Sequence, residues 1–514
     1  MIVGAALSLG IGVALPYSNM IIKGGLLGHN FNTPAAVFSF FLFVGVVNVL
    51  LGLVKRSWEF GAAELATVYI MAMLATTVPT IGFSEYLLPI IAGVRFYATR
   101  ENKWGDSFVP HLPDRLVPTD EEAIQGFYEG DPEGGVPWDA WVEPVLWWCL
   151  LILAVYWVSI CLMVIVRRQW MEHERLPYPL VQVPLALIEE EDRQGGRSLI
   201  KPFFRSKVMW AGFALPFVVG SLNALNSYFP GLPHMGAFSG HGALFNLADR
   251  ISLTAQFNFG LLGFAFLLNR DVALSVWLFF LLANVERGVF AFFEIRSDET
   301  LSRFANIAGP YLAHQAMGAM IVLVLSGFWA GRGHLRQVVS KACRRGAAID
   351  DNGELLSFRA SMIGLAAGLA VVGAWLWGSG LPLWVVPVFL FAVLIVFVAL
   401  TRAVVEGGIA FIRTPLTPAD FVVSGLGTGV LGTSGVVALG LTYVWAANLR
   451  LFFMPCFANA LRMAGEIGGN RGPLLWAAVA AVLLALAGSI WSVLTLSYEY
   501  GGVNLPHFWA VAIP

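Results

Sequence analysis

Charged residues are scarce in this sequence: Asp, Glu, Lys and Arg make up 12% of its 514 residues, against roughly a quarter in an ordinary soluble domain. Hydrophobic residues make up 58%, and the mean hydropathy is +0.73. A soluble fold of this composition could not cover its surface with polar groups. The composition therefore excludes a cytosolic enzyme, a nucleic-acid binder and a disordered protein, and it predicts an all-α, polytopic transmembrane helical bundle.

Cysteine is also scarce, and several catalytic motifs are missing. Cys149, Cys161, Cys343 and Cys456 lie far apart without a Cys-x-x-Cys pair, which indicates neither a disulfide framework nor a metal cluster. The sequence HERLP at 173–177 lacks the second histidine of the His-Glu-x-x-His zinc motif, and no Walker A motif is present. We therefore expect no enzymatic activity, no cofactor, no bound metal and no ATP-driven transport within this chain.

A membrane-spanning helix needs about 20 mostly apolar residues, and the runs of this kind predict about thirteen crossings plus re-entrant segments in a single domain, 1–514. The first run has no basic start and no small-residue cleavage site, so we expect it to stay in the mature protein. The closing GGVNLPHFWAVAIP is typical of the approach to another apolar segment, which leaves open whether the protein continues. The runs lie near 3–22, 35–54, 60–80, 144–166, 208–228, 253–269, 272–293, 306–329, 359–378, 382–401, 418–440, 442–461 and 473–497.

Lys and Arg mark the cytoplasmic loops of membrane proteins. Basic residues concentrate in the loops at 168–207 and 330–358, which fall on one side of the membrane if the runs alternate. The loop at 99–143 is strongly acidic and falls on the other side. The charge pattern therefore predicts a multi-pass protein of the plasma (inner) membrane with a cytoplasmic N-terminus and an extracytoplasmic acidic loop.

Two segments do not fit as full crossings. Residues 82–98 are too short, and both of their ends would have to face outside, whereas residues 229–250 are rich in Gly, Pro and His. Non-helical backbone at membrane depth is tolerated only where protein or a water-filled cavity satisfies its polar groups. We interpret both segments either as re-entrant segments that line a cavity or as loops on the outer surface.

Arg402 and Glu406 stand four residues apart in an apolar run, so they share one helical face and can neutralise each other. Gly407 and Gly408 follow, and they break the helix or allow another segment to approach closely. Transporter sites are built around discontinuous helices of this kind, which makes Arg402 and Glu406 candidates for proton coupling. The alternative is a charged anchor at the cytoplasmic end of the helix.

Two further ionisable residues lie in apolar runs, where each costs free energy unless it is paired or faces water. Glu64, near the cytoplasmic end of the third run, is either a proton-coupling carboxylate or an interfacial group. His314 could relay protons, and its alternative role is packing.

Neutral polar residues also lie within or beside the apolar runs, at Tyr17, Asn19, Asn223 and Asn226. Pro16 predicts a kink in the first helix that frees backbone carbonyl groups. A polar solute inside the bilayer needs hydrogen-bonding partners, so we expect these four residues and the glycine break to bind substrate. Hydrogen bonds between helices are the alternative role of the asparagines.

Four motifs, in the same order along the chain, resemble the oligopeptide transporter superfamily, which includes the yellow-stripe-like metal-chelate transporters. They are LGIGVALPYSNMIIKGGLLGHNFNTPAAVFSFF, ELATVYIMAMLATTVPTIGFSEYLLPII, ERLPYPLVQVPLALI and ALTRAVVEGGIAFIRTPLTPADFVVSGLG. The chain departs from the family pattern at Leu65, Leu180 and Val181, so it resembles a divergent member. The resemblance implies two structurally related halves and a secondary active, usually proton-coupled transporter of small peptides or metal chelates.

The sequence leaves two functions open. The first is a proton-coupled transporter whose partners are a small-molecule substrate, protons and the lipid bilayer, with no nucleic acid. The second is a non-transporting scaffold or subunit that keeps the transporter fold and binds partners through the acidic outer loop, as a homo-oligomer or in a larger membrane complex. Polar residues that converge on one cavity would favour the first, and a filled or lipid-facing core would favour the second.

Overall fold

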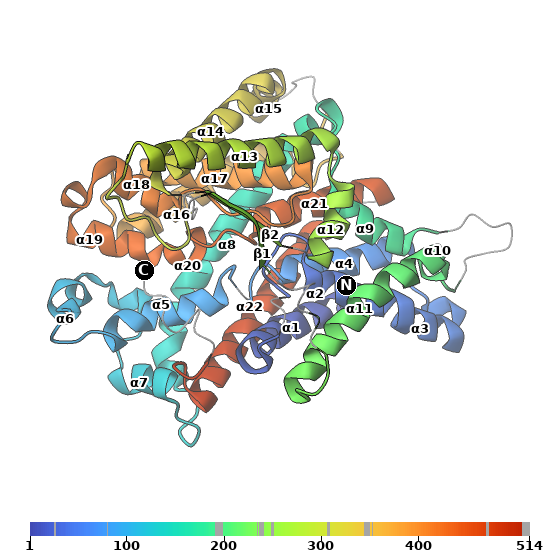
Figure 1. Ribbon diagram of the computed structural model, residues 1–514, viewed down its shortest axis with the longest axis horizontal. Helices are drawn as coiled ribbons and strands as arrows, with labels where there is room; N and C mark the ends of the chain where they lie inside the picture. The colour runs from blue at the N-terminus through green and yellow to red at the C-terminus, as the bar shows by residue number, and fades with distance from the viewer. Residues whose placement is uncertain are drawn as a thin grey trace.

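A computed structural model of the chain describes most of its residues (Figure 1). The described ranges are 1–24, 27–79, 81–190, 199–233, 235, 241–247, 251–256, 258–305, 309–343, 350–351, 353–468 and 472–505. Parts of the predicted segment 229–250 and of both basic loops, including Arg193, Arg197, Arg344 and Arg345, therefore lie outside the described residues.

Nine helices in the described ranges are long and apolar enough to cross a membrane. This result confirms a multi-pass helical membrane protein, whereas the number thirteen is not confirmed. Three of the nine continue through a π-helical turn, at η1 (Ser18–Ile22), η2 (Phe43–Val47) and η6 (Gln169–His173). The nine are α1 with η1 (Ile2–Ile22), α2 with η2 and α3 (Pro34–Val54), α8 with η6 (Trp138–His173), α11 (Lys207–Tyr228), α13 (Arg270–Phe292), α14 (Pro310–Ala330), α16 (Phe358–Gly378), α17 (Val386–Gly407) and α22 (Gly472–Tyr500).

The remaining apolar runs form shorter elements. The run at 418–440 is divided because Gly427, with φ 79°, separates α18 from α19, and Gly432, with φ 68°, kinks α19. Glycine adopts such angles without the steric cost of a Cβ. The shorter helices are α4 (Ala62–Ala75), α5 (Ser84–Phe96), α6 (Trp104–Ser107), α7 (Glu121–Glu129), α9 (Pro179–Ile188), α10 (Pro202–Arg205), α12 (Phe259–Leu267), α15 (Arg332–Cys343), α18 (Pro418–Leu426), α19 (Thr428–Leu441), α20 (Tyr443–Ala446) and α21 (Phe453–Ile467), with 3-10 turns η3 (Arg56–Trp58), η4 (Val109–His111) and η5 (Asp114–Leu116).

A small antiparallel hairpin interrupts the otherwise helical fold. Strand β1 (His241–Leu247) pairs with β2 (Ile251–Gln256), with His241 opposite Gln256 and Leu247 opposite Ile251. The predicted run at 253–269 therefore begins as a strand and continues as α12. The hairpin is a local exception to the expected all-α class.

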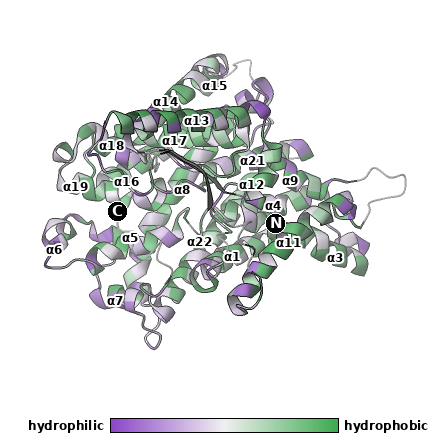
Figure 2. Ribbon diagram, in the orientation of Figure 1, coloured by the Kyte–Doolittle hydropathy of each residue, from purple (hydrophilic) through white to green (hydrophobic). Residues whose placement is uncertain are grey.

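The shortest core helices are the most deeply buried. Every residue of α4 from Val68 to Ala75 and every residue of α5 from Ser84 to Gly93 is buried, as is α21 from Phe453 to Leu461. In contrast, no described residue of α11 is buried, and Asn284 is the one buried residue of α13. Hydrophobic residues cover the long helices, and hydrophilic residues gather near α7, α10 and α15 (Figure 2). The short helices α4, α5 and α21 therefore form the centre together with the long helices α8, α17 and α22, which are also largely buried, whereas α11 and α13 lie outside it.

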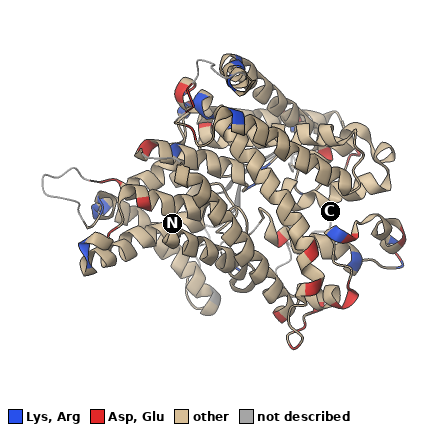
Figure 3. Cartoon of the chain, turned by 180° about the vertical axis from the view of Figure 1, so that it is seen from behind, with Lys and Arg blue, Asp and Glu red and all other residues tan. Residues whose placement is uncertain are grey.

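The acidic and basic loops lie at different ends of the bundle (Figure 3). In the acidic loop, the Tyr498 hydroxyl donates to the Ala123 carbonyl at 2.6 Å, and Arg115 donates to the Gly378 carbonyl at 2.9 Å. At the basic end, Arg167 donates to the Glu354 carboxylate at 2.6 and 2.7 Å. These contacts fix the acidic loop to the ends of α22 and α16, and they join the end of α8 to the basic loop at 330–358.

Glycine lets α1 pack directly on α22. A Cβ on Gly12 would lie 2.9 Å from the Ala485 carbonyl oxygen, and a Cβ on Gly488 would lie 3.0 Å from that of Leu9. Small residues at helix contacts allow backbones to approach closely, which is how helices associate in lipid. The α1–α22 pair therefore depends on residues without side chains at both positions.

We predict that Gly12→Ala destabilises the protein by about 1 to 3 kcal/mol, because the new methyl group forces two packed backbones apart. Gly10→Ala on the same helix is the matched control, since a Cβ there meets nothing within 4 Å. Thermal unfolding of the purified protein in detergent measures both. Equal stability of the two variants would contradict the packing role of Gly12.

Candidate functional site

The end of α17 packs against the Leu-Pro-Tyr-Pro segment that precedes α9. Gly408 ends the helix with φ 64°, and a Cβ there would lie 2.8 Å from Pro179 Cβ and Cγ. The Tyr178 backbone N–H donates to the Val405 carbonyl oxygen at 2.9 Å. The predicted helix end at Gly407 and Gly408 is therefore present, and its glycine allows both a left-handed turn and a close contact.

A third irregular segment reaches the same place. The Phe31 backbone N–H, between η1 and α2, donates to the Ala410 carbonyl oxygen at 3.1 Å. Phe31 is buried and packs edge-on against Phe452, with ring centroids 5.6 Å apart. We call residues 27–33, 176–179 and 405–410 the junction. Two backbone hydrogen bonds join residues 405–410 to the other two segments, and bonds of this kind satisfy the polar groups of irregular backbone within a membrane protein.

Asn19 lies on the π-helical turn that leads into the junction. It is 5% exposed, and its Nδ2–H donates to Glu85 Oε1 at 3.0 Å. Glu85, on α5, is 0% exposed. Its second oxygen, Oε2, and Asn19 Oδ1 have no hydrogen-bond partner among the described residues. The pair therefore places two unused acceptor atoms in the protein interior, which is costly unless a proton or a ligand satisfies them.

Burial controls the charge of the ionisable groups near this turn. Glu85 lies on α5, which is not one of the nine long helices. Burial raises the pKa of Glu85 well above its usual range, and the hydrogen bond from Asn19 opposes this rise only in part. Burial also lowers the pKa of His29, in the loop after η1, to about 4. Both groups are therefore driven towards their neutral forms.

Neutral acceptors extend from this turn into the junction. The Oδ1 atoms of Asn30 and Asn32 have no hydrogen-bond partner among the described residues. Asn32 also lines a small pocket with Tyr69 and Asn459. The interior beside the junction is thus rich in uncharged hydrogen-bonding groups.

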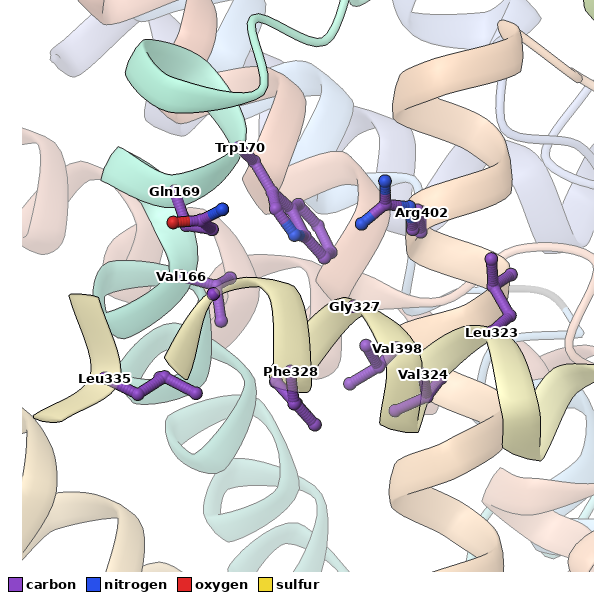
Figure 4. Close-up of a pocket in the computed structure, with 11 residues that line it drawn as sticks. Val166, Gln169, Trp170, Leu323, Val324, Gly327, Phe328, Leu335, Val398 and Arg402 are labelled. Carbon is purple, nitrogen blue, oxygen red and sulfur yellow. The ribbon is translucent and has the colours of Figure 1, made fainter. Parts of the chain in front are cut away.

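The predicted Arg402–Glu406 pair is present and has an additional partner. Arg402 Nε–H donates to Glu406 Oε2 at 2.9 Å, and its second guanidinium nitrogen lies 2.7 Å from Glu174 Oε2. The guanidinium lines a pocket between α8, α14 and α17, where it points toward Trp170 (Figure 4). Arg402 therefore links the end of α17 to the segment that leads to α9.

The other predicted coupling residues lie at the periphery. Glu64 is exposed, and its carboxylate accepts the Gly61 backbone N–H at 2.9 Å, which caps α4. His314 Nε2 lies 2.9 Å from Glu299 Oε2, and Ser424 also donates to Glu299. This geometry matches the interfacial alternative for Glu64 and gives His314 a partner on the turn before α14.

The predicted substrate-binding residues do not form one cluster. Tyr17 is 45% exposed, whereas Asn19 is buried. Asn226 donates to the Leu232 carbonyl at 2.6 Å, and Asn223 accepts the Met235 N–H at 2.8 Å. The two α11 asparagines therefore stabilise the turn after that helix, and neither has a hydrogen bond to Asn19 or to the junction among the contacts of the described residues.

Sequence reasoning missed Glu85 and Glu174. Glu85 interrupts an apolar stretch, SEYLLPII, inside the segment 82–98 that we expected not to cross the bilayer. A carboxylate in such a stretch was the available signal. Glu174 carried no comparable signal, because it lies in a charged stretch, MEHER, and gains its role only from contact with Arg402.

Comparison with known proteins places the whole chain in a family. The model described as "Family of unknown function (DUF6785)" matches residues 1–514. No curated protein and no solved structure matches the chain.

We predict that Glu406→Gln alone costs about 1 kcal/mol or less, because Glu174 still pairs with Arg402. The double variant Glu174→Gln/Glu406→Gln should cost about 3 kcal/mol, because it leaves a largely buried guanidinium without either carboxylate. Chemical unfolding of both variants and of Glu174→Gln measures the difference. A cost for Glu406→Gln equal to that of the double variant would show that Glu174 contributes nothing.

Proposed function

The chain belongs to the DUF6785 family, and for this membrane protein we propose secondary active transport of a small polar solute, coupled to protons, across the plasma (inner) membrane. The observation that carries this proposal is the junction, where two backbone hydrogen bonds join the irregular segments around Phe31 and Tyr178 to the end of α17, among long apolar helices. Transporters place their sites at such interruptions, because unwound backbone can bind a solute.

The chemistry beside the junction supports an uncharged or zwitterionic solute. Asn19, Asn30 and Asn32 offer amide groups, and Arg402 is already occupied by two carboxylates. A strongly anionic solute would need unpaired basic groups at depth. Together with the resemblance to oligopeptide and metal-chelate transporters, this favours a short peptide or a chelate of low net charge.

The ion pairs of Arg402 with Glu174 and Glu406 suggest how the site opens. Arg402 connects Glu406 on α17 to Glu174, which follows η6, and Gly408 contacts Pro179 beside it. Loss of these ion pairs would free the Leu-Pro-Tyr-Pro segment from α17. We propose that this separation exposes the junction to one side of the membrane, with Arg402 and Glu406 retained as candidate coupling groups.

The acidic loop is proposed to face outside and α15 the cytoplasm. Cys343, at the end of α15, is the one exposed cysteine, since Cys149 is half-buried and the other two are buried. An impermeant maleimide added to intact cells should therefore fail to label the wild type, and should label it after permeabilisation. In Cys343→Ser/Glu122→Cys, intact cells should be labelled directly. The reverse pattern would invert the topology.

We predict that Gly408→Ala lowers the initial rate of uptake at least about tenfold, because its methyl group displaces Pro179 from the junction. Gly427→Ala is the matched control: it also has a positive φ, but its Cβ meets nothing within 4 Å. Proteoliposomes with an imposed proton gradient, screened with short peptides and metal–chelator complexes, measure uptake. If the wild type moves none of these under any gradient, the scaffold alternative is favoured.

A further inference from the structure

The carboxyl group of Glu85 has no role in the function proposed above. We infer that Glu85 is a proton-binding site: its carboxyl group carries a proton in this conformation and releases it when the Asn19 turn rearranges. The claim that this proton drives transport rests on the proposed function. The claim that Glu85 binds a proton is independent of that function.

The geometry supplies one donor for two oxygens. Asn19 Nδ2–H satisfies Glu85 Oε1, and Oε2 remains without a partner among the described residues. An ionised carboxylate would need several donors or a cation at this depth. A proton on Oε2 removes the charge and needs neither.

The ionisable groups on the surrounding elements do not replace that proton. Helix α5 packs against α6, α7, α20 and α22. None of their ionisable side chains makes a hydrogen bond or ion pair with Glu85 among the contacts of the described residues. The positive charges of Arg303 and Arg413 lie close enough to the neighbouring Tyr86 to oppose the rise in its pKa that burial causes. The groups on those elements are Asp106, Glu121, Glu122, Tyr128, Glu129, Tyr443, Tyr498, Glu499 and Tyr500.

A metal cation fits the pair less well than a proton. Ca²⁺ takes six to eight oxygen ligands, whereas Glu85 Oε2 and Asn19 Oδ1 are the two unused oxygens of the pair. The proton is the smallest cation and needs one oxygen. The structure therefore assigns the proton as the ligand.

The position of Asn19 connects the proton to a movable element. Asn19 lies in η1, and the residue that follows this π-helical turn, Lys23, has a left-handed φ of 54°. Single π turns occur often at functional sites. Ionised Glu85 would demand further donors, so loss of the proton would favour a different conformation of η1 and of the junction segment that follows it.

Infrared difference spectroscopy between low and high pH tests the site without any substrate. The wild type should show a protonated carboxyl band that Glu85→Gln lacks, and Asn19→Ala should shift the band to higher frequency because a hydrogen bond to the carbonyl is lost. Glu64→Gln, which removes an exposed carboxylate, should keep the band. If Glu85→Gln and the wild type give the same carboxyl bands, Glu85 is not the proton site.

The pH dependence of stability gives a second test. A carboxyl group whose pKa is raised by folding stabilises the folded state at low pH and loses that contribution as pH rises. The Tm of the wild type should therefore fall relative to that of Glu85→Gln between about pH 5 and pH 8, while Glu64→Gln should follow the wild type. A constant difference in Tm across this range would overturn the inference.

Transport measurements separate this inference from the proposed function. If the infrared band is present and no solute is taken up, Glu85 binds a proton and the transporter proposal fails. If uptake occurs and Glu85→Gln retains the pH dependence of the wild type together with all of its carboxyl bands, transport stands and the proton site fails.

Discussion

Every backbone polar group inside a lipid bilayer must find its partner within the protein, and the structure of the junction follows from this constraint. A regular helix satisfies the rule on its own, but the segments around Phe31, Tyr178 and Ala410 are not helical. They satisfy it by bonding across to one another, from Phe31 to Ala410 and from Tyr178 to Val405. Residues 405–410 therefore hold both of the other segments, so a change at the end of α17 alters a contact of each.

Glycines, which have no side chain, make this arrangement sterically possible. Gly408 allows Pro179 to approach α17, and Gly12 allows α22 to approach α1. A glycine also allows α8 and α16 to pack closely, since a Cβ on Gly368 would lie 2.7 Å from Val158. In lipid the hydrophobic effect does not drive helices together, so close van der Waals contact has to do so. Glycine thus serves tight helix packing at Gly12 and Gly368, and at Gly408 it serves both a close contact and the turn that ends α17.

The sequence predicted the class of fold and the location of the helix end at Gly408, because apolar length and glycine pairs are local signals. It did not predict that the run at 418–440 is divided, since Gly427 and Gly432 interrupt the backbone without lowering the hydropathy of the run. The Arg402–Glu406 pair followed from helical spacing. Glu174 could not be found in this way, because its contact with Arg402 depends on how α8 and α17 pack. The Asn19–Glu85 pair could not be found from spacing either, because it joins η1 to α5 and depends on how these two elements pack.

Two buried glutamates show that the surroundings, and not burial alone, decide the charge of a carboxyl group. Glu354 accepts hydrogen bonds from Arg167 and Arg168 at 2.6 to 2.7 Å. Burial would raise its pKa, but these arginines hold it below the usual range. Glu85 is fully buried and has one neutral amide donor. A carboxylate that is fully paired, as Glu354 is, serves to join two loops. A carboxyl group left with an unused oxygen, as in Glu85, lowers stability unless it is protonated, which is the behaviour expected of a proton site and not of a structural ion pair.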